Sequence, residues 1–85
     1  MTLTTHGIVL SAGGRLWKVY VREVVRIGED WFVQIVAMGP RACTLFVRTD
    51  DPDLGAQAGP VLRRIREWLA GGSLPECAFL DLVAE

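Results

Sequence analysis

The stretch RLWKVYVREVVRIGEDWFVQIVAMGPRACTLFVRT, residues 15–49, decides the fold. It contains three runs in which side chains of two kinds alternate, separated by Gly28-Glu29-Asp30 and Gly39-Pro40-Arg41. A period of two is typical of β-strands, because successive side chains point to opposite faces of a sheet. Breaks that contain glycine or proline are typical of hairpin turns. The stretch therefore predicts three antiparallel strands over 15–27, 31–38 and 42–49.

The register of these hairpins is predicted by keeping the apolar side chains together on one face. A three-residue loop at each turn sets Val25 opposite Val33 and Ile35 opposite Leu45. One face then becomes almost entirely apolar, and we expect it to form the core. Its members are Trp17, Val19, Val21, Glu23, Val25, Ile27, Trp31, Val33, Ile35, Ala37, Cys43, Leu45, Val47 and Thr49.

The reverse face of this predicted sheet is also rich in apolar side chains, fringed by arginines. A solvated antiparallel sheet normally carries polar residues on its outer face, and apolar patches with a polar rim commonly mark interaction sites. We therefore expect a partner there, most simply a second copy of the chain. The alternative is that the first and last segments of the chain fold over this face. The predicted interface consists of Tyr20, Arg22, Val24, Arg26, Phe32, Val36, Met38, Phe46 and Arg48.

The rest of the chain predicts a strand before this stretch, and a helix and a final strand after it. Gly7–Ser11 is expected to be a short first strand. Apolar residues recur at helical spacing over Pro60–Leu69, and Gly71-Gly72 is expected to end that helix. Alternation over Glu76–Val83 predicts a final strand. The predicted fold is a single α+β domain over residues 1–85, with a four-stranded antiparallel meander, one helix on one sheet face and a short closing strand.

Composition narrows the class of protein. Hydrophobic residues make up 51% of the 85 residues and charged residues 22%, which is typical of a compact globular chain. No run approaches the roughly 18 apolar residues that a membrane span needs. The first residues lack the basic and apolar regions of a secretory signal, so we expect a cytoplasmic protein with no membrane partner.

Groups suited to catalysis are few. His6 is the one histidine, and no carboxylate lies at a spacing that would orient it as a general base. His6, Cys43 and Cys77 lie far apart in the sequence without any paired spacing typical of a metal site. We therefore expect neither an enzyme nor a bound metal or cofactor. Two cysteines are too few for a disulfide framework, and we expect reduced thiols.

Two other functions are consistent with parts of the sequence. A basic and aromatic strand face could bind nucleic acid, because strand aromatics can stack on bases. The overall charge of −1 and the presence of a single lysine make this less favoured. A small molecule could bind near Trp17, Trp31 and Trp68. We favour a non-enzymatic protein-interaction or accessory module that self-associates through its apolar sheet face. We expect no cofactor. The predicted nucleic-acid set is Lys18, Tyr20, Arg22, Arg26 and Arg48.

Overall fold

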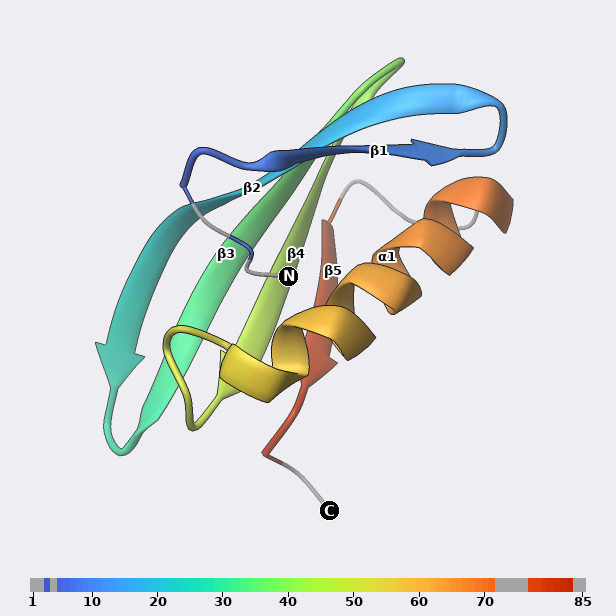
Figure 1. The fold of residues 1–85 in the computed structure, drawn as a ribbon. Coiled ribbons are helices and arrows are strands. Elements are labelled where there is room, and N and C mark those ends of the chain that lie inside the picture. The colour runs from blue at the N-terminus through green and yellow to red at the C-terminus, as the bar shows by residue number, and fades with distance from the viewer. Residues whose placement is uncertain (1–2, 4, 72–76, 84–85) are drawn as a thin grey trace.

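The computed structural model describes residues 3, 5–71 and 77–83, which form one five-stranded sheet and one α-helix (Figure 1). The predicted α+β fold is confirmed. The elements in chain order are β1 (Ile8–Ala12), β2 (Arg15–Ile27), β3 (Asp30–Met38), β4 (Ala42–Thr49), the 3-10 turn η1 (Gly55–Gln57), α1 (Ala58–Gly71) and β5 (Cys77–Asp81).

The strands lie side by side in sequence order, β1-β2-β3-β4-β5. The first four form the predicted antiparallel meander, whereas β5 runs parallel to β4 at the edge of the sheet. A parallel neighbour requires a crossover connection, and α1 supplies it. The pairing continues just past β5, where the Leu82 amide donates to the Arg48 carbonyl oxygen at 2.9 Å.

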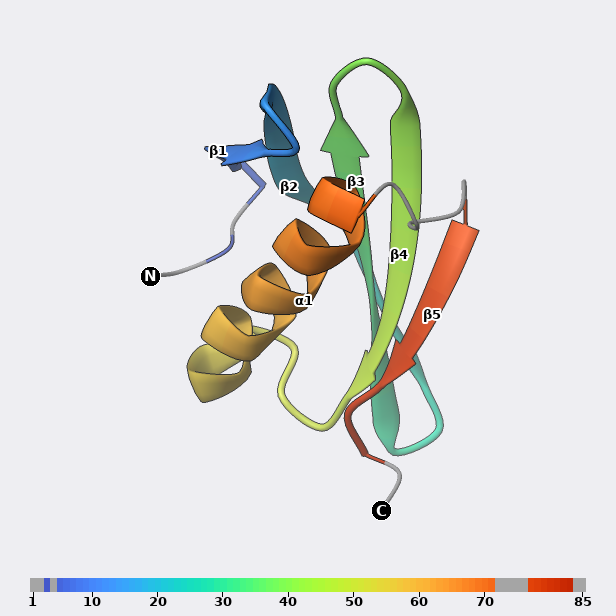
Figure 2. The same ribbon diagram turned by 90° about the vertical axis from the view of Figure 1, so that its right-hand side faces the viewer.

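The helix covers one face of the sheet only, so the domain has two layers (Figure 2). The apolar side of α1, which includes Val61, Ile65 and Leu69, is buried against the sheet. Leu3 belongs to the same buried cluster, which places it on the helix side of the sheet. The core therefore lies between α1 and the sheet face that α1 covers. The most deeply buried strand residues of this core are Val19, Val33, Ile35, Cys43, Leu45 and Val47.

The predicted pairing of β3 with β4 is confirmed. Ile35 lies opposite Leu45, and Trp31 lies opposite Thr49. The predicted pairing of β2 with β3 was wrong. The turn has two residues, Gly28 and Glu29, so that Ile27 pairs with Asp30.

A β-bulge at Arg22 accompanies the shorter turn and returns the first half of β2 to its predicted faces. The register shifts between Val21 and Glu23, which leaves Arg22 as an extra residue in β2. An extra residue reverses the faces of all side chains beyond it. Of the predicted core residues in β2, only those before the bulge, Trp17, Val19 and Val21, are buried in the core. Beyond it, Val25 is 41% exposed and Ile27 is 61% exposed.

Four residues of the predicted core set require correction. Glu23, Val25 and Ile27 were expected in the core and instead lie on the opposite face. Trp31 is on the core side but only half-buried. The alternation before and after the bulge looks the same in sequence, so the apolar pattern of β2 could not show where it changes phase.

The remaining element ends differ from the prediction by one or two residues. The helix begins at Ala58 instead of Pro60 and continues through Gly71. The first strand is Ile8–Ala12, one residue later than predicted. The final strand is Cys77–Asp81, shorter than predicted. The predicted glycine at 72 in the helix stop and the predicted strand start at residue 76 lie outside the described residues.

Candidate protein interface on the open sheet face

The sheet face opposite α1 is called the open face here. Its rows follow from the observed register and from the alternation of side chains. From the β3–β4 turn toward the β2–β3 turn, these rows are Val9/Lys18/Met38/Ala42, Tyr20/Val36/Thr44/Cys77, Glu23/Gln34/Phe46/Phe79 and Val25/Phe32/Arg48/Asp81.

No described element covers this face. The helix lies on the other side of the sheet, and β5 extends the sheet sideways without folding over it (Figure 2). Leu3, the described residue nearest the start of the chain, packs with the helix-side core. The described parts of the first and last segments therefore leave the open face uncovered.

Several large apolar side chains are exposed on the open face. Phe79 of β5 is 57% exposed and Met38 of β3 is 46% exposed. Phe32 and Phe46 are half-buried between their strand neighbours. Exposed apolar groups gathered on one face favour a contact with another molecule.

A depression of about 230 Å³ lies at the hairpin end of the open face. Apolar side chains form most of its lining, and Glu23 contributes one carboxylate. It is lined by Glu23, Val25, Ile27, Phe32, Gln34 and Phe46. Val25 and Ile27 line this depression because the register beyond the bulge places them on the open face.

Val36 differs from the other predicted interface residues on this face. It lies on the open face between Tyr20 and Thr44, but its own exposure is only 4%. Its neighbours already cover it, so it has little surface to offer a partner. A charged residue at Val36 would disturb the packing of the sheet itself, and Phe79 or Met38 is a better probe of the interface.

Arg48 joins three strands at the lower row of the open face. Its guanidinium donates to Asp30 Oδ2 through Nη2 at 2.6 Å and to Asp81 Oδ2 through Nη1 at 2.9 Å. The hydrogen bond with Asp30, followed by that with Asp81, raises the pKa of Arg48 above its ordinary value. The cluster holds β5 against β3 and β4 and commits Arg48 to contacts within the chain.

The structure moves three predicted interface residues off the open face or onto its margin. Val24 pairs with the fully buried Val33 and so lies on the helix side of the sheet. Arg26 also lies on the helix side, with its guanidinium 5.7 Å from the Trp31 ring. Arg22 is the bulge residue. The prediction that all three share a face with Phe32 was wrong, because it placed no bulge in β2.

The predicted nucleic-acid set is separated by the same shift. Lys18 and Tyr20 remain together on the open face, with the ammonium 6.0 Å from the ring centroid. Arg26 is on the other face, and Arg48 is bonded to two carboxylates. These residues do not form one continuous cationic strip.

The predicted interface missed two residues that lie on the open face, Phe79 and Val25. The alternation in the predicted final strand groups Phe79 with Cys77, but whether that side joins the open face depends on how β5 pairs with β4. Val25 was assigned to the core. No local signal identified the bulge, because both Arg22 and Glu23 are charged.

The cysteines and two of the tryptophans that the sequence singles out lie in different environments. Both cysteines are free, and Cys43 is buried in the core whereas Cys77 is exposed on the open face. No group of three metal-ligating side chains occurs among the described residues. Trp17 is buried, and its Nε1 donates to the Ala12 carbonyl oxygen at 3.2 Å. Trp68 is half-buried and stacks with Arg64 at 5.2 Å.

No family model, curated protein or solved structure matches this chain. Within the described part of the chain, no helix has the length and apolar character needed to cross a membrane.

Proposed function

We propose that this protein is a non-enzymatic interaction module that self-associates through its open sheet face. The observation that carries the proposal is the exposed apolar surface of that face, centred on Phe79, Met38 and Val25, which the described residues leave uncovered. Two such faces can pack against one another as the sheets of a β-sandwich do.

The dimensions of the face suit a small dimer interface. Five strands spaced about 4.8 Å apart and about eight residues long cover roughly 500 Å² in plan. Two copies would bury about 1,000 Å² in total, which is near the lower limit for a specific interface. Buried area does not set affinity, so the strength of such a dimer depends on the apolar and charged side chains of the face.

The charges on β2 favour a second copy over an unrelated apolar partner. Lys18 and Glu23 have opposite charges and lie on the same strand and the same face. A copy whose strands run in the opposite direction would bring Lys18 of each subunit near Glu23 of the other. Complementary charges of this kind set the orientation of an interface more than its affinity.

The test is the native mass, measured by size-exclusion chromatography with light scattering over a range of micromolar concentrations. We expect a dimer for the unmodified chain and a folded monomer for Phe79→Glu. Burial of a phenylalanine is worth roughly 2 kcal/mol, and a buried unpaired carboxylate adds a further penalty.

Val24→Glu is the matched control. Val24 is an exposed apolar residue on the same sheet, but it lies on the helix side. The control should remain a dimer. A monomeric unmodified chain throughout the concentration range would refute the proposal, as would dissociation by both variants with folding intact.

A further inference from the structure

The second surface of interest is the free edge of β5. This strand pairs with β4 on one side and has no described neighbour on the other. Because the Leu82 amide bonds to β4, alternation along the strand directs the backbone groups of Leu80 to β4 as well and those of Phe79 away from it. The edge therefore presents the N–H and C=O groups of Phe79 to a further strand.

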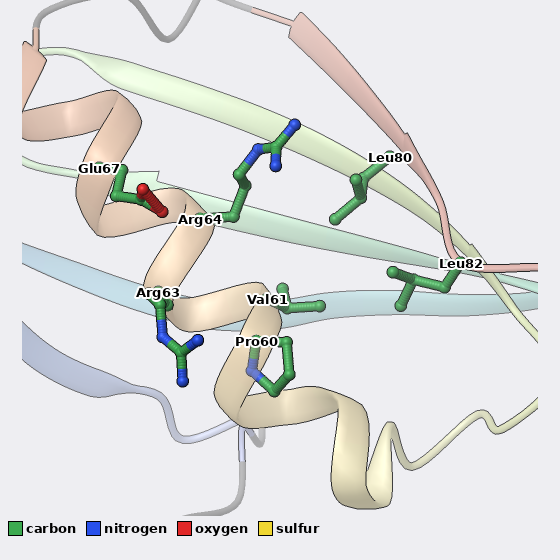
Figure 3. A pocket seen from close by; sticks show the side chains of 7 residues that line it. All are labelled: Pro60, Val61, Arg63, Arg64, Glu67, Leu80 and Leu82. Carbon is green, nitrogen blue, oxygen red and sulfur yellow. The ribbon is translucent and has the colours of Figure 1, made fainter.

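A groove runs beside this edge, between α1 and β5 (Figure 3). Its volume is about 260 Å³. Leu80 and Leu82 project from the strand toward the helix, and the Arg64 side chain extends toward Leu80. The lining consists of Pro60, Val61, Arg63, Arg64, Glu67, Leu80 and Leu82.

The groove combines an apolar floor with an excess of positive charge. Val61, Leu80 and Leu82 provide apolar surface. Two arginines and one glutamate line the walls, so the local balance is one positive charge. Because Arg64 is the cation that points toward the strand, a carboxylate at the edge of β5 would meet it.

The position of α1 limits what can occupy the edge. Figure 1 shows α1 crossing obliquely over β5, with its C-terminal turns on the side away from β4. Pairing between two β5 strands requires a two-fold axis normal to the sheet. This symmetry would place the α1 helices of both copies on the same side of the joined sheet. Each helix would then lie over the line where the two β5 strands meet, and the helices would collide. An extended segment without a helix avoids this conflict.

We infer that the β5 edge binds an extended peptide segment of another protein, which adds as a sixth strand beneath α1. The backbone of the segment pairs with Phe79. Alternate side chains of the segment enter the groove. We expect an aliphatic side chain to contact Leu80 and Leu82, and an Asp or Glu two positions away to contact Arg64. Charge-assisted hydrogen bonds to the guanidinium provide the specificity. The site uses the backbone of Phe79, whereas the proposed open-face dimer uses its side chain.

The experiment is a selection of phage-displayed random peptides on the unmodified protein, with Arg64→Glu as the counter-selection target. We expect enrichment of peptides with an aliphatic residue and an acidic residue two positions apart. A synthetic peptide of the most enriched sequence, followed by fluorescence anisotropy, should bind Arg64→Glu about tenfold more weakly than the unmodified chain.

Arg66→Glu is the matched charge control, because Arg66 is an exposed arginine of the same helix that lines a different cavity, beside β1. It should change the affinity by no more than about twofold. Phe79→Pro tests the backbone contact against Phe79→Ala. Proline removes a strand N–H that faces solvent without breaking the ladder, so Phe79→Pro should fold and bind more weakly than Phe79→Ala.

Three results would overturn the inference. One is the absence of any peptide that prefers the unmodified chain to Arg64→Glu. Another is an equal loss of affinity for Arg66→Glu and Arg64→Glu. The third is a Phe79→Pro variant that fails to fold or that binds as Phe79→Ala does, because either result would show that the Phe79 amide is not a free edge donor available to the peptide.

Discussion

The two faces of this sheet are built from the same alternating strands, but they differ in how they are covered. On the helix side, Ile35 and Val47 are buried beneath α1. On the open face, Phe79 and Met38 remain exposed. The comparison shows that apolar content alone does not decide which face becomes the core. One helix can cover only one face. The position of the bulge decides which residues of β2 face the helix.

The largest expected effect comes from deletions within β2. Deletion of Lys18 breaks the alternation within the first half of the strand, so that Trp17 or Val19 must leave the core. Loss of a buried tryptophan costs about 3–5 kcal/mol, a large part of the 5–15 kcal/mol that is typical of a domain. We expect Lys18 deletion to abolish cooperative thermal unfolding, measured by circular dichroism.

Deletion of Arg22 is the matched control for this prediction. Removing the bulge residue leaves the pairing on both sides unchanged, with Val21 on the core face and Glu23 on the open face. The Arg22 deletion should therefore unfold cooperatively. If it unfolds like the Lys18 deletion, the bulge is not where the structure places it.

A substitution pair measures the difference between the two faces. Ile35→Ala removes a side chain with 1% exposure and should lower the free energy of unfolding by about 2–5 kcal/mol. Ile27→Ala removes the same atoms from a residue beyond the bulge and should cost less than about 0.5 kcal/mol. Urea denaturation at a concentration low enough to keep the chain monomeric checks both values. Similar losses would indicate that Ile27 is buried as well.

The smallest effect is expected at Arg48, whose ion pairs hold the edge strand β5 in place. Arg48→Met removes the hydrogen bonds to Asp30 and Asp81 that hold β5 to its neighbours. We expect faster hydrogen exchange at the Leu80 amide, with little change in the exchange of β3. Arg15→Met, a change of the same kind at an exposed position of β2, should leave Leu80 unchanged. Equal protection of Leu80 in both variants would contradict the anchoring role of Arg48.

Much of the fold could be predicted from local patterns. The turn at Gly39-Pro40-Arg41 and the alternation on both sides of it gave the correct β3–β4 register. The spacing of Val61, Ile65 and Leu69 indicated the helix and its buried side. These signals were sufficient because the period of each pattern is the same throughout its element.

Less of the candidate interface could be predicted. Phe32, Phe46, Met38 and Tyr20 lie on the open face as predicted, whereas Val24 and Arg26 do not. The predicted faces of β2 are wrong from the bulge at Arg22 to the turn. A two-residue turn with a bulge places the first half of β2 on the same faces as a three-residue turn without one, so the alternation does not distinguish the two arrangements.

The sequence by itself determined the strands, the helix and the presence of more apolar strand surface than one helix can cover, because these properties depend on side-chain periodicity along a single element. Only the tertiary structure decided the bulge in β2, the parallel pairing of β5 and the exposure of Phe79 on the open face. These features depend on hydrogen bonds between strands that are distant in sequence, and no local pattern specifies which backbone groups will meet.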